Sequence, residues 1–235
     1  MNSSLKEKKI TVKFFLNQAL EPASDERGMK LYPLYFQVTY NRKNMQAKSR
    51  YGLFYKHLKE VPAELTAFEE KVLTKIIRYE AEGKEESYEL KGLKRKYDLY
   101  SVSVYQALEA YLKPQLRMAV LKIGGQLATV LDFTQAKVST CLLHEAATLL
   151  FPQFDSSLPH KLRDDLQTYN IFQNLNKEPV LSYNFPTIID WLDGSYKAEL
   201  ILLPALKGNP DGAKKVVKLI DDAVKEALKA FDTNP

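Results

Sequence analysis

Hydrophobic and polar side chains alternate in three short segments near the start of the chain, residues 10–16, 34–40 and 45–51. A period of two is typical of strands that bury one face and leave the other in water. The turn-forming cluster 41–44 separates the last two segments and predicts an antiparallel hairpin. Since a lone hairpin is marginally stable in water, we expect the first segment to complete a three-stranded sheet.

The period becomes helical after residue 60. Apolar side chains recur every three or four positions over 63–82, with Pro62 at a position that a first helical turn tolerates. We expect this helix to cover the apolar face of the sheet. An acidic and then a basic block occupy 83–100 and indicate a solvated connection, in which the basic residues are a weaker candidate for a phosphate contact. The helical patterns that follow cover 101–112, 114–131 (interrupted by Gly124 and Gly125), 134–151 with Thr134 as its N-cap, 159–175, 186–193 and 212–231.

Together these patterns predict an α+β fold. An N-terminal three-stranded antiparallel sheet packs on a helix in residues 1–82, a charged connection spans 83–100, and a mostly α-helical domain occupies 101–235. The chain has 235 residues, 45% of them hydrophobic, which is enough to bury a sizeable core.

Composition excludes several classes of protein. The single cysteine, Cys141, rules out an internal disulfide framework and a cysteine-rich zinc site. The polar residues 1–9 lack the apolar core of a signal peptide, and no apolar run approaches the ~20 residues of a membrane helix. We therefore expect a cytoplasmic protein that has no membrane partner and needs no cofactor.

Positive charge is concentrated at one end of the chain. Residues 1–60 hold 12 Lys and Arg against 5 Asp and Glu, a net charge of +7, whereas 61–235 hold 22 against 24, a net charge of −2. Such an excess indicates a polyanionic partner. Alternation places Thr11, Tyr35 and most of the polar candidates on the outward face of the sheet, and Arg42 and Lys43 at the hairpin tip. The candidate DNA contacts are Lys13, Gln37, Thr39, Arg42, Lys43, Gln46, Lys48 and Arg50.

The segment YPLYFQVTYNRKNMQAKSRYGLFY, residues 32–55, resembles the N-terminal arm-type DNA-binding domain of phage-integrase-like tyrosine recombinases. The similarity covers residues 8–60 and rests on 33–40, the basic tip at Arg42 and Lys43, and 48–52. It implies a three-stranded sheet that packs on a helix and binds DNA arm sites, with the same eight residues as contacts.

The catalytic domain of that family is not recognised in the rest of the chain. His160 and Arg163 form a His-x-x-Arg motif, with Arg117 before it and Trp191 and Tyr196 after it, and such groups suit attack by tyrosine on phosphorus. Only 43 residues separate Arg117 from His160, and Asp164 and Asp165 would repel a phosphate beside Arg163. His144 lacks the second histidine of a zinc helix, so we expect neither catalysis nor a metal site.

The hypothesis is therefore a DNA-binding protein without enzymatic activity, whose helical domain serves dimerisation or docking of a protein partner. The alternative is a helical interaction or structural protein whose N-terminal sheet is only a scaffold. The two differ in whether the chain has a DNA affinity that falls steeply with salt.

Overall fold

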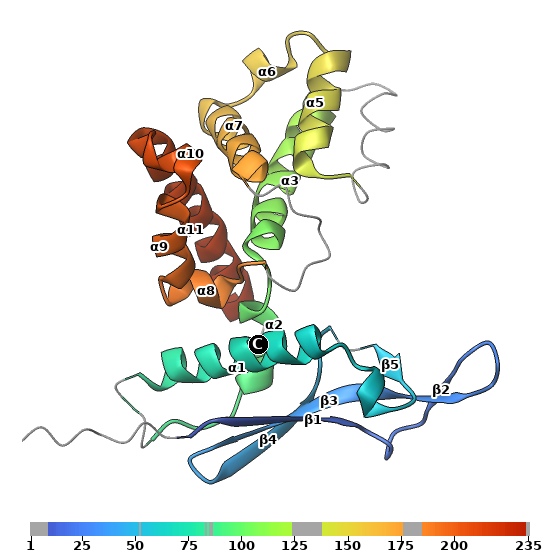
Figure 1. Cartoon of the computed structure of the whole chain (residues 1–235). Coiled ribbons are helices and arrows are strands. Elements are labelled where there is room, and N and C mark those ends of the chain that lie inside the picture. Colours follow the sequence, from blue (N-terminus) through green and yellow to red (C-terminus); the bar gives the residue numbers. More distant parts are fainter. Residues whose placement is uncertain are drawn as a thin grey trace, which may run out of the picture. The chain divides into compact units, whose positions relative to one another are not determined.

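The computed structural model of this chain describes residues 9–51, 53–82, 84, 87–123, 138–175 and 185–233. Two compact units divide the chain, Met1–Ser101 and Val102–Pro235. Strands occur in the first unit and helices follow them, which confirms the predicted α+β fold (Figure 1).

Three antiparallel strands form the body of the sheet in the first unit. The central strand, β3 (Lys30–Tyr40), pairs on one side with β1 (Thr11–Leu16) and on the other with β4 (Lys43–Lys48). The predicted hairpin and third strand are therefore confirmed. Two short strands that alternation did not predict, β2 (Ala23–Ser24) and β5 (Phe54–Tyr55), pair with the first residues of β3.

The β3–β4 turn is tighter than the four-residue cluster predicted. Asn41 and Arg42 have φ values of 50° and 64°, and Lys43 and Asn44 already belong to β4. Two consecutive residues with positive φ are the mark of a two-residue hairpin turn, whose twist matches that of the flanking strands. Asn accepts this conformation more readily than Arg does, and the turn places Arg42 at the exposed tip.

One face of the sheet is buried by helices, and we call it the inner face. Leu34, Phe36 and Val38 of β3 are fully buried there. Helix α1 (Ala63–Ala81) runs along this side of the sheet, after the short 3-10 turn η1 (Leu58–Glu60), as Figure 1 shows. The predicted helix over 63–82 is thus confirmed, with its apolar stripe turned inward.

A second helix, α2 (Leu93–Tyr100), lies in the stretch that the charge pattern assigned to a solvated connection. Its Leu93 and Tyr97 are fully buried, and the ring of Tyr97 meets that of Phe36 edge-on at 5.1 Å between centroids. Residues up to Ser101 therefore belong to the first unit. The two buried positions are four residues apart, as on one helix face, but the charged residues between them hide the pattern.

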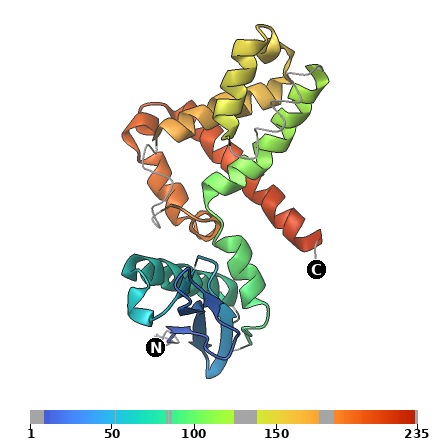
Figure 2. The same cartoon turned by 90° about the vertical axis from the view of Figure 1, so that its right-hand side faces the viewer.

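The described part of the second unit contains helices, with no strand beyond an isolated bridge between Ser103 and Thr187. Its helices are α3 (Val104–Ile123), α5 (Thr140–Leu150), α6 (Phe154–Ser157), α7 (His160–Leu175), α8 (Ile188–Leu192), α9 (Ser195–Ile201), α10 (Pro204–Lys207) and α11 (Pro210–Thr233). Helix α11 buries one face, as the 212–231 pattern predicted, and packs against α3 and α7. Figure 2 shows α11, in red, crossing α3, in green.

Several helices differ from those predicted, and α6, α9 and α10 lie where no helix was expected. The two helices expected at 101–112 and 114–131 are one helix, α3, that continues through Pro114 at the cost of one backbone hydrogen bond. Gly124, Gly125 and the predicted cap Thr134 lie outside the described residues. Helix α5 begins at Thr140, where the Ser139 hydroxyl caps it by accepting a 3.4 Å hydrogen bond from the Leu142 amide. Within the described ranges, no helix combines the length and the apolar character needed to cross a bilayer.

Candidate nucleic-acid interface

The strand register places nine side chains together on the side of the sheet opposite the inner face, and we call this surface the outer face. Three come from each strand of the β1–β3–β4 body. They are Thr11, Lys13 and Phe15 of β1, Tyr35, Gln37 and Thr39 of β3, and Asn44, Gln46 and Lys48 of β4. None is a carboxylate, all are at least partly exposed, and none is among the buried residues of the unit.

The middle row of the outer face carries its two glutamines. Lys13, Gln37 and Gln46 lie opposite one another in the register. Gln46 donates from Nε2 to Oε1 of Gln37 at 2.7 Å, so the two amides form one connected pair. Because Gln46 is exposed, the pair keeps hydrogen-bonding capacity toward solvent.

The flanking rows differ in character. On one side Thr11, Thr39 and Asn44 form a row of small polar groups, in which the Thr39 hydroxyl donates to Oδ1 of Asn44 at 2.6 Å. On the other side Phe15 and Tyr35 place their ring centroids 5.9 Å apart next to Lys48. Nζ of Lys48 lies 5.2 Å from the centroid of the Phe54 ring, a cation–π contact at the margin of the face.

Six of the eight candidate contacts lie where the alternation predicted. Five share the outer face, namely Lys13, Gln37, Thr39, Gln46 and Lys48. The sixth, Arg42, is exposed at the hairpin turn. Lys43 and Arg50 lie elsewhere, so the outer face holds fewer cations than the sequence predicted.

Lys43 points to the inner side of the sheet. It opposes Tyr40 in the register, one position out of phase with the outer-face residues of β4, because the turn is two residues long. Its Nζ forms an ion pair of 2.9 Å with Oε1 of Glu89. The hydrogen bond and charge of Lys43 lower the pKa of Glu89 below its usual range.

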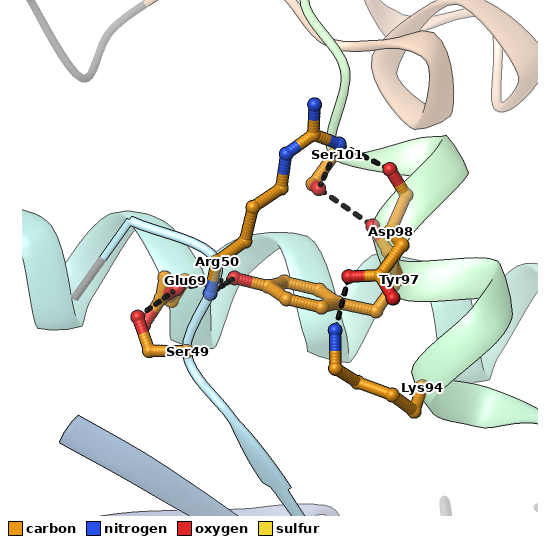
Figure 3. Close-up of polar contacts among 7 residues, drawn as sticks. All are labelled: Ser49, Arg50, Glu69, Lys94, Tyr97, Asp98 and Ser101. Atoms are coloured by element: carbon orange, nitrogen blue, oxygen red, sulfur yellow. Dashed lines mark hydrogen bonds and ion pairs between the residues drawn. The ribbon is translucent and has the colours of Figure 1, made fainter. Parts of the chain in front are cut away.

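Arg50 turns toward α2 and not toward the outer face. β4 ends at Lys48, and the alternation read through residue 51 fails because Ser49 is buried in the helix layer. Nη1 of Arg50 donates to the backbone carbonyl of Asp98 and lies 3.4 Å from Oγ of Ser101 (Figure 3). The guanidinium therefore ties the end of β4 to the C-terminal end of α2.

A buried carboxylate that the sequence analysis did not single out organises this region. Glu69 of α1 is fully buried and accepts hydrogen bonds from the hydroxyls of Ser49 and Tyr97 (Figure 3). Burial raises the pKa of Glu69, and burial beside Glu69 raises that of Tyr97. The sequence could have indicated this site, because Glu69 lies on the apolar stripe of the 63–82 helix and a glutamate is rarely buried without partners.

Two lysines of α2 form ion pairs. Lys94 pairs with Asp98 one turn later, and Lys96 pairs with Glu80 of α1. The Lys94–Asp98 pair lies within α2, and the Lys96–Glu80 pair joins α2 to α1. They leave the outer face as the better candidate for an anionic partner.

Three residues of the His-x-x-Arg constellation, Arg163, Trp191 and Tyr196, make structural contacts within the second unit. Nη2 of Arg163 donates to the carbonyls of Ser156 and Leu158, at 3.0 and 3.2 Å, and so closes the turn before α7. Nε1 of Trp191 donates to Asp221 at 2.9 Å, and the buried Tyr196 ring packs against that of Trp191. Among the residues that the structure describes, no three His, Cys, Asp or Glu side chains gather as metal ligands would.

Neither the protein-family models nor the curated proteins nor the solved structures include a significant match to this chain.

Proposed function

We propose that the outer face binds duplex DNA, with the β3–β4 ribbon in the major groove. The observation that carries this proposal is a face of nine side chains that holds two lysines, five uncharged polar side chains other than tyrosine, an aromatic pair and no carboxylate. B-DNA's major groove, about 12 Å wide, admits a two-stranded ribbon. Neighbouring strands lie about 4.8 Å apart, so Lys13 on β1 stands beside the ribbon, where a phosphate backbone would run.

The distribution of charge between the units supports the proposal. Residues 1–101 hold 20 Lys and Arg against 14 Asp and Glu, a net charge of +6, and residues 102–235 hold 14 against 15, a net charge of −1. A field of this kind favours the approach of a polyanion to the first unit. The similarity of residues 8–60 to arm-type domains points to the same partner.

The proposed contact set is smaller than the one predicted from sequence. Lys13, Arg42 and Lys48 supply the positive charge, and Gln37, Thr39 and Gln46 supply the uncharged hydrogen-bonding groups. Lys43 and Arg50 are left out because their charged groups are held by Glu89 and by the end of α2. In this proposal those two side chains support the fold of the binding unit.

A salt titration of the full-length chain tests the proposal. Each phosphate contact contributes about −0.9 to the slope of log affinity against log salt concentration. Replacing Lys13, Arg42 and Lys48 together by alanine should weaken binding and make the slope shallower by about 2 to 3. The matched control replaces Lys59, Lys84 and Lys91, three exposed lysines outside the outer face, by alanine.

The control removes the same net charge, so it separates local contact from the general field. Equal loss in the two triple variants would overturn the outer face as the binding surface. Absence of any salt-dependent DNA binding by the unsubstituted chain would overturn the function itself. The remaining hypothesis would then be a helical interaction protein with a scaffold sheet.

A further inference from the structure

We propose that the Gln37–Gln46 pair reads an adenine in the major groove, with Gln46 as the contacting residue and Gln37 as its positioning residue. This inference rests on the proposed DNA binding and specifies what the outer face recognises. It starts from the hydrogen bond of 2.7 Å that joins the two amides in the middle row of the face.

The hydrogen bond restrains the orientation of the Gln46 amide. One of the two N–H groups of Gln46 is occupied by Oε1 of Gln37. If the occupied N–H is the one trans to Oε1, the other N–H and the Oε1 acceptor of Gln46 form one free edge of the carboxamide. A glutamine side chain in solution has free rotation about its terminal torsion, so a neighbour that holds it reduces the entropy lost on binding.

The remaining edge matches one base only. Adenine presents the N7 acceptor and the N6 donor side by side in the major groove, which pair with the N–H and the Oε1 of a glutamine. Guanine presents two acceptors, so its O6 would face Oε1 of Gln46. Thymine offers an acceptor and a methyl group, and cytosine offers a single donor. If both amides exchange their oxygen and nitrogen, Gln46 is held through its oxygen and the two N–H groups point outward, an arrangement that would suit guanine.

The two arrangements of the amides predict different bases: the one in the structure selects adenine, and the exchanged one selects guanine. The full-length chain is used to select duplexes from a pool with a randomised central segment. The expected result is enrichment of A·T at one position, with discrimination of about 5- to 150-fold against other pairs. Enrichment of guanine at that position would overturn the proposal.

Substitutions assign the position to Gln46. Gln46→Ala should abolish the preference at that position and leave the salt slope unchanged. Gln46→Glu should move the preference toward cytosine, since a carboxylate accepts from the cytosine N4 amino group. An adenine preference that survives Gln46→Ala would show that another side chain reads the base and would overturn the inference.

The positioning role of Gln37 has its own readout. Gln37→Glu keeps an acceptor for the Gln46 N–H, so the ratio of affinities for A·T and G·C should survive even though the added charge weakens binding overall. Gln37→Leu removes the acceptor and should reduce that ratio. Equal ratios in the two variants would overturn the positioning role.

A base analogue separates this inference from the proposed function. Replacing the selected adenine by 7-deaza-adenine removes the N7 acceptor and should weaken binding of the unsubstituted chain but not of the Gln46→Ala variant. If the chain binds DNA with the expected salt dependence but enriches no base pair, the adenine inference fails and DNA binding stands. If it binds no DNA, both fail.

Discussion

The hydroxyl of Ser49 donates a 2.7 Å hydrogen bond to Oε1 of Glu69 and so joins the residue that follows β4 to the middle of α1. The hydroxyl of Tyr97 on α2 donates to the same oxygen. Three elements of the first unit thus meet at one buried carboxylate. Its second oxygen, Oε2, is buried without a hydrogen-bond partner among the described residues.

Stability of the first unit should depend on the ionisation of Glu69. Burial raises the pKa of its carboxyl above the ordinary value of 4.5. Between 4.5 and the raised pKa the folded state binds more protons than the unfolded state, so the free energy of unfolding falls as pH rises through this window. Glu69→Gln keeps an acceptor oxygen and removes the charge. Urea unfolding measured from pH 4.5 to neutral pH should lose this decline in the variant.

Glu64→Gln is the matched control, because Glu64 lies exposed in the first turn of the same helix. The control should keep the decline of the unsubstituted chain. An equal pH dependence in Glu69→Gln and the unsubstituted chain would contradict a raised pKa at Glu69.

Removing the Tyr97 hydroxyl should destabilise the first unit. In Tyr97→Phe the Ser49 hydroxyl is, among the described residues, the one hydroxyl that still donates to Glu69. The variant also removes the hydroxyl oxygen that accepts a hydrogen bond from the backbone nitrogen of Arg50 at 3.4 Å. An unsatisfied buried group costs about 1–3 kcal/mol. Chemical denaturation should show a loss of that size, whereas Tyr79→Phe, at a ring that is 38% exposed on α1, should change stability by less than about 0.5 kcal/mol. Similar losses in the two variants would argue against the buried contact.

Helix α2 should be required for the first unit to fold. A fragment of residues 1–101 contains the buried Leu93 and Tyr97, and a fragment of residues 1–90 lacks both. Full burial of a large apolar side chain contributes about 1.5–3 kcal/mol. The longer fragment should unfold in one cooperative thermal transition followed by near-UV circular dichroism, and the shorter should not. Cooperative unfolding of both fragments at the same temperature would contradict this assignment of α2.

Cys141 should report on the packing of the second unit. The Glu109 carboxylate of α3 accepts hydrogen bonds from the Thr140 amide and hydroxyl of α5, and from the Tyr169 hydroxyl of α7 at 2.7 Å. Burial, with a contribution from Glu109, raises the pKa of the neighbouring Cys141 thiol to about 12, so little thiolate is present at neutral pH.

Glu109→Ala should therefore accelerate alkylation of Cys141 by iodoacetamide, because it loosens α5 and removes a nearby negative charge. Since Cys141 is the single cysteine of the chain, the reaction can be followed by mass without interference. Glu199→Ala, at an exposed position of α9, is the control and should leave the rate unchanged. An unchanged rate in Glu109→Ala would show that the carboxylate does not hold α5 in place.

Strand faces could be read from the chain because they depend on local geometry. Successive side chains of a strand point to opposite sides, so the pattern of β1 and β3 was enough to place Lys13, Gln37 and Thr39 together. The amphipathic period of α1 and α11 was equally informative. Helix α2 was not predicted, because charged residues surround its two buried positions in the sequence. The partners of these charges, such as Glu80 for Lys96, lie on another helix.

By itself, then, the sequence determined the α+β fold, the alternation of the strands and the concentration of positive charge in the first unit. Only the tertiary structure decided which cations share the outer face. Lys43 and Arg50 point away from the outer face because they bind acceptors 46 and 48 residues further along the chain, at Glu89 and Asp98. A side chain's direction at a turn or past the end of a strand depends on such distant partners, and these are brought near only by the packing of α1 and α2 on the sheet.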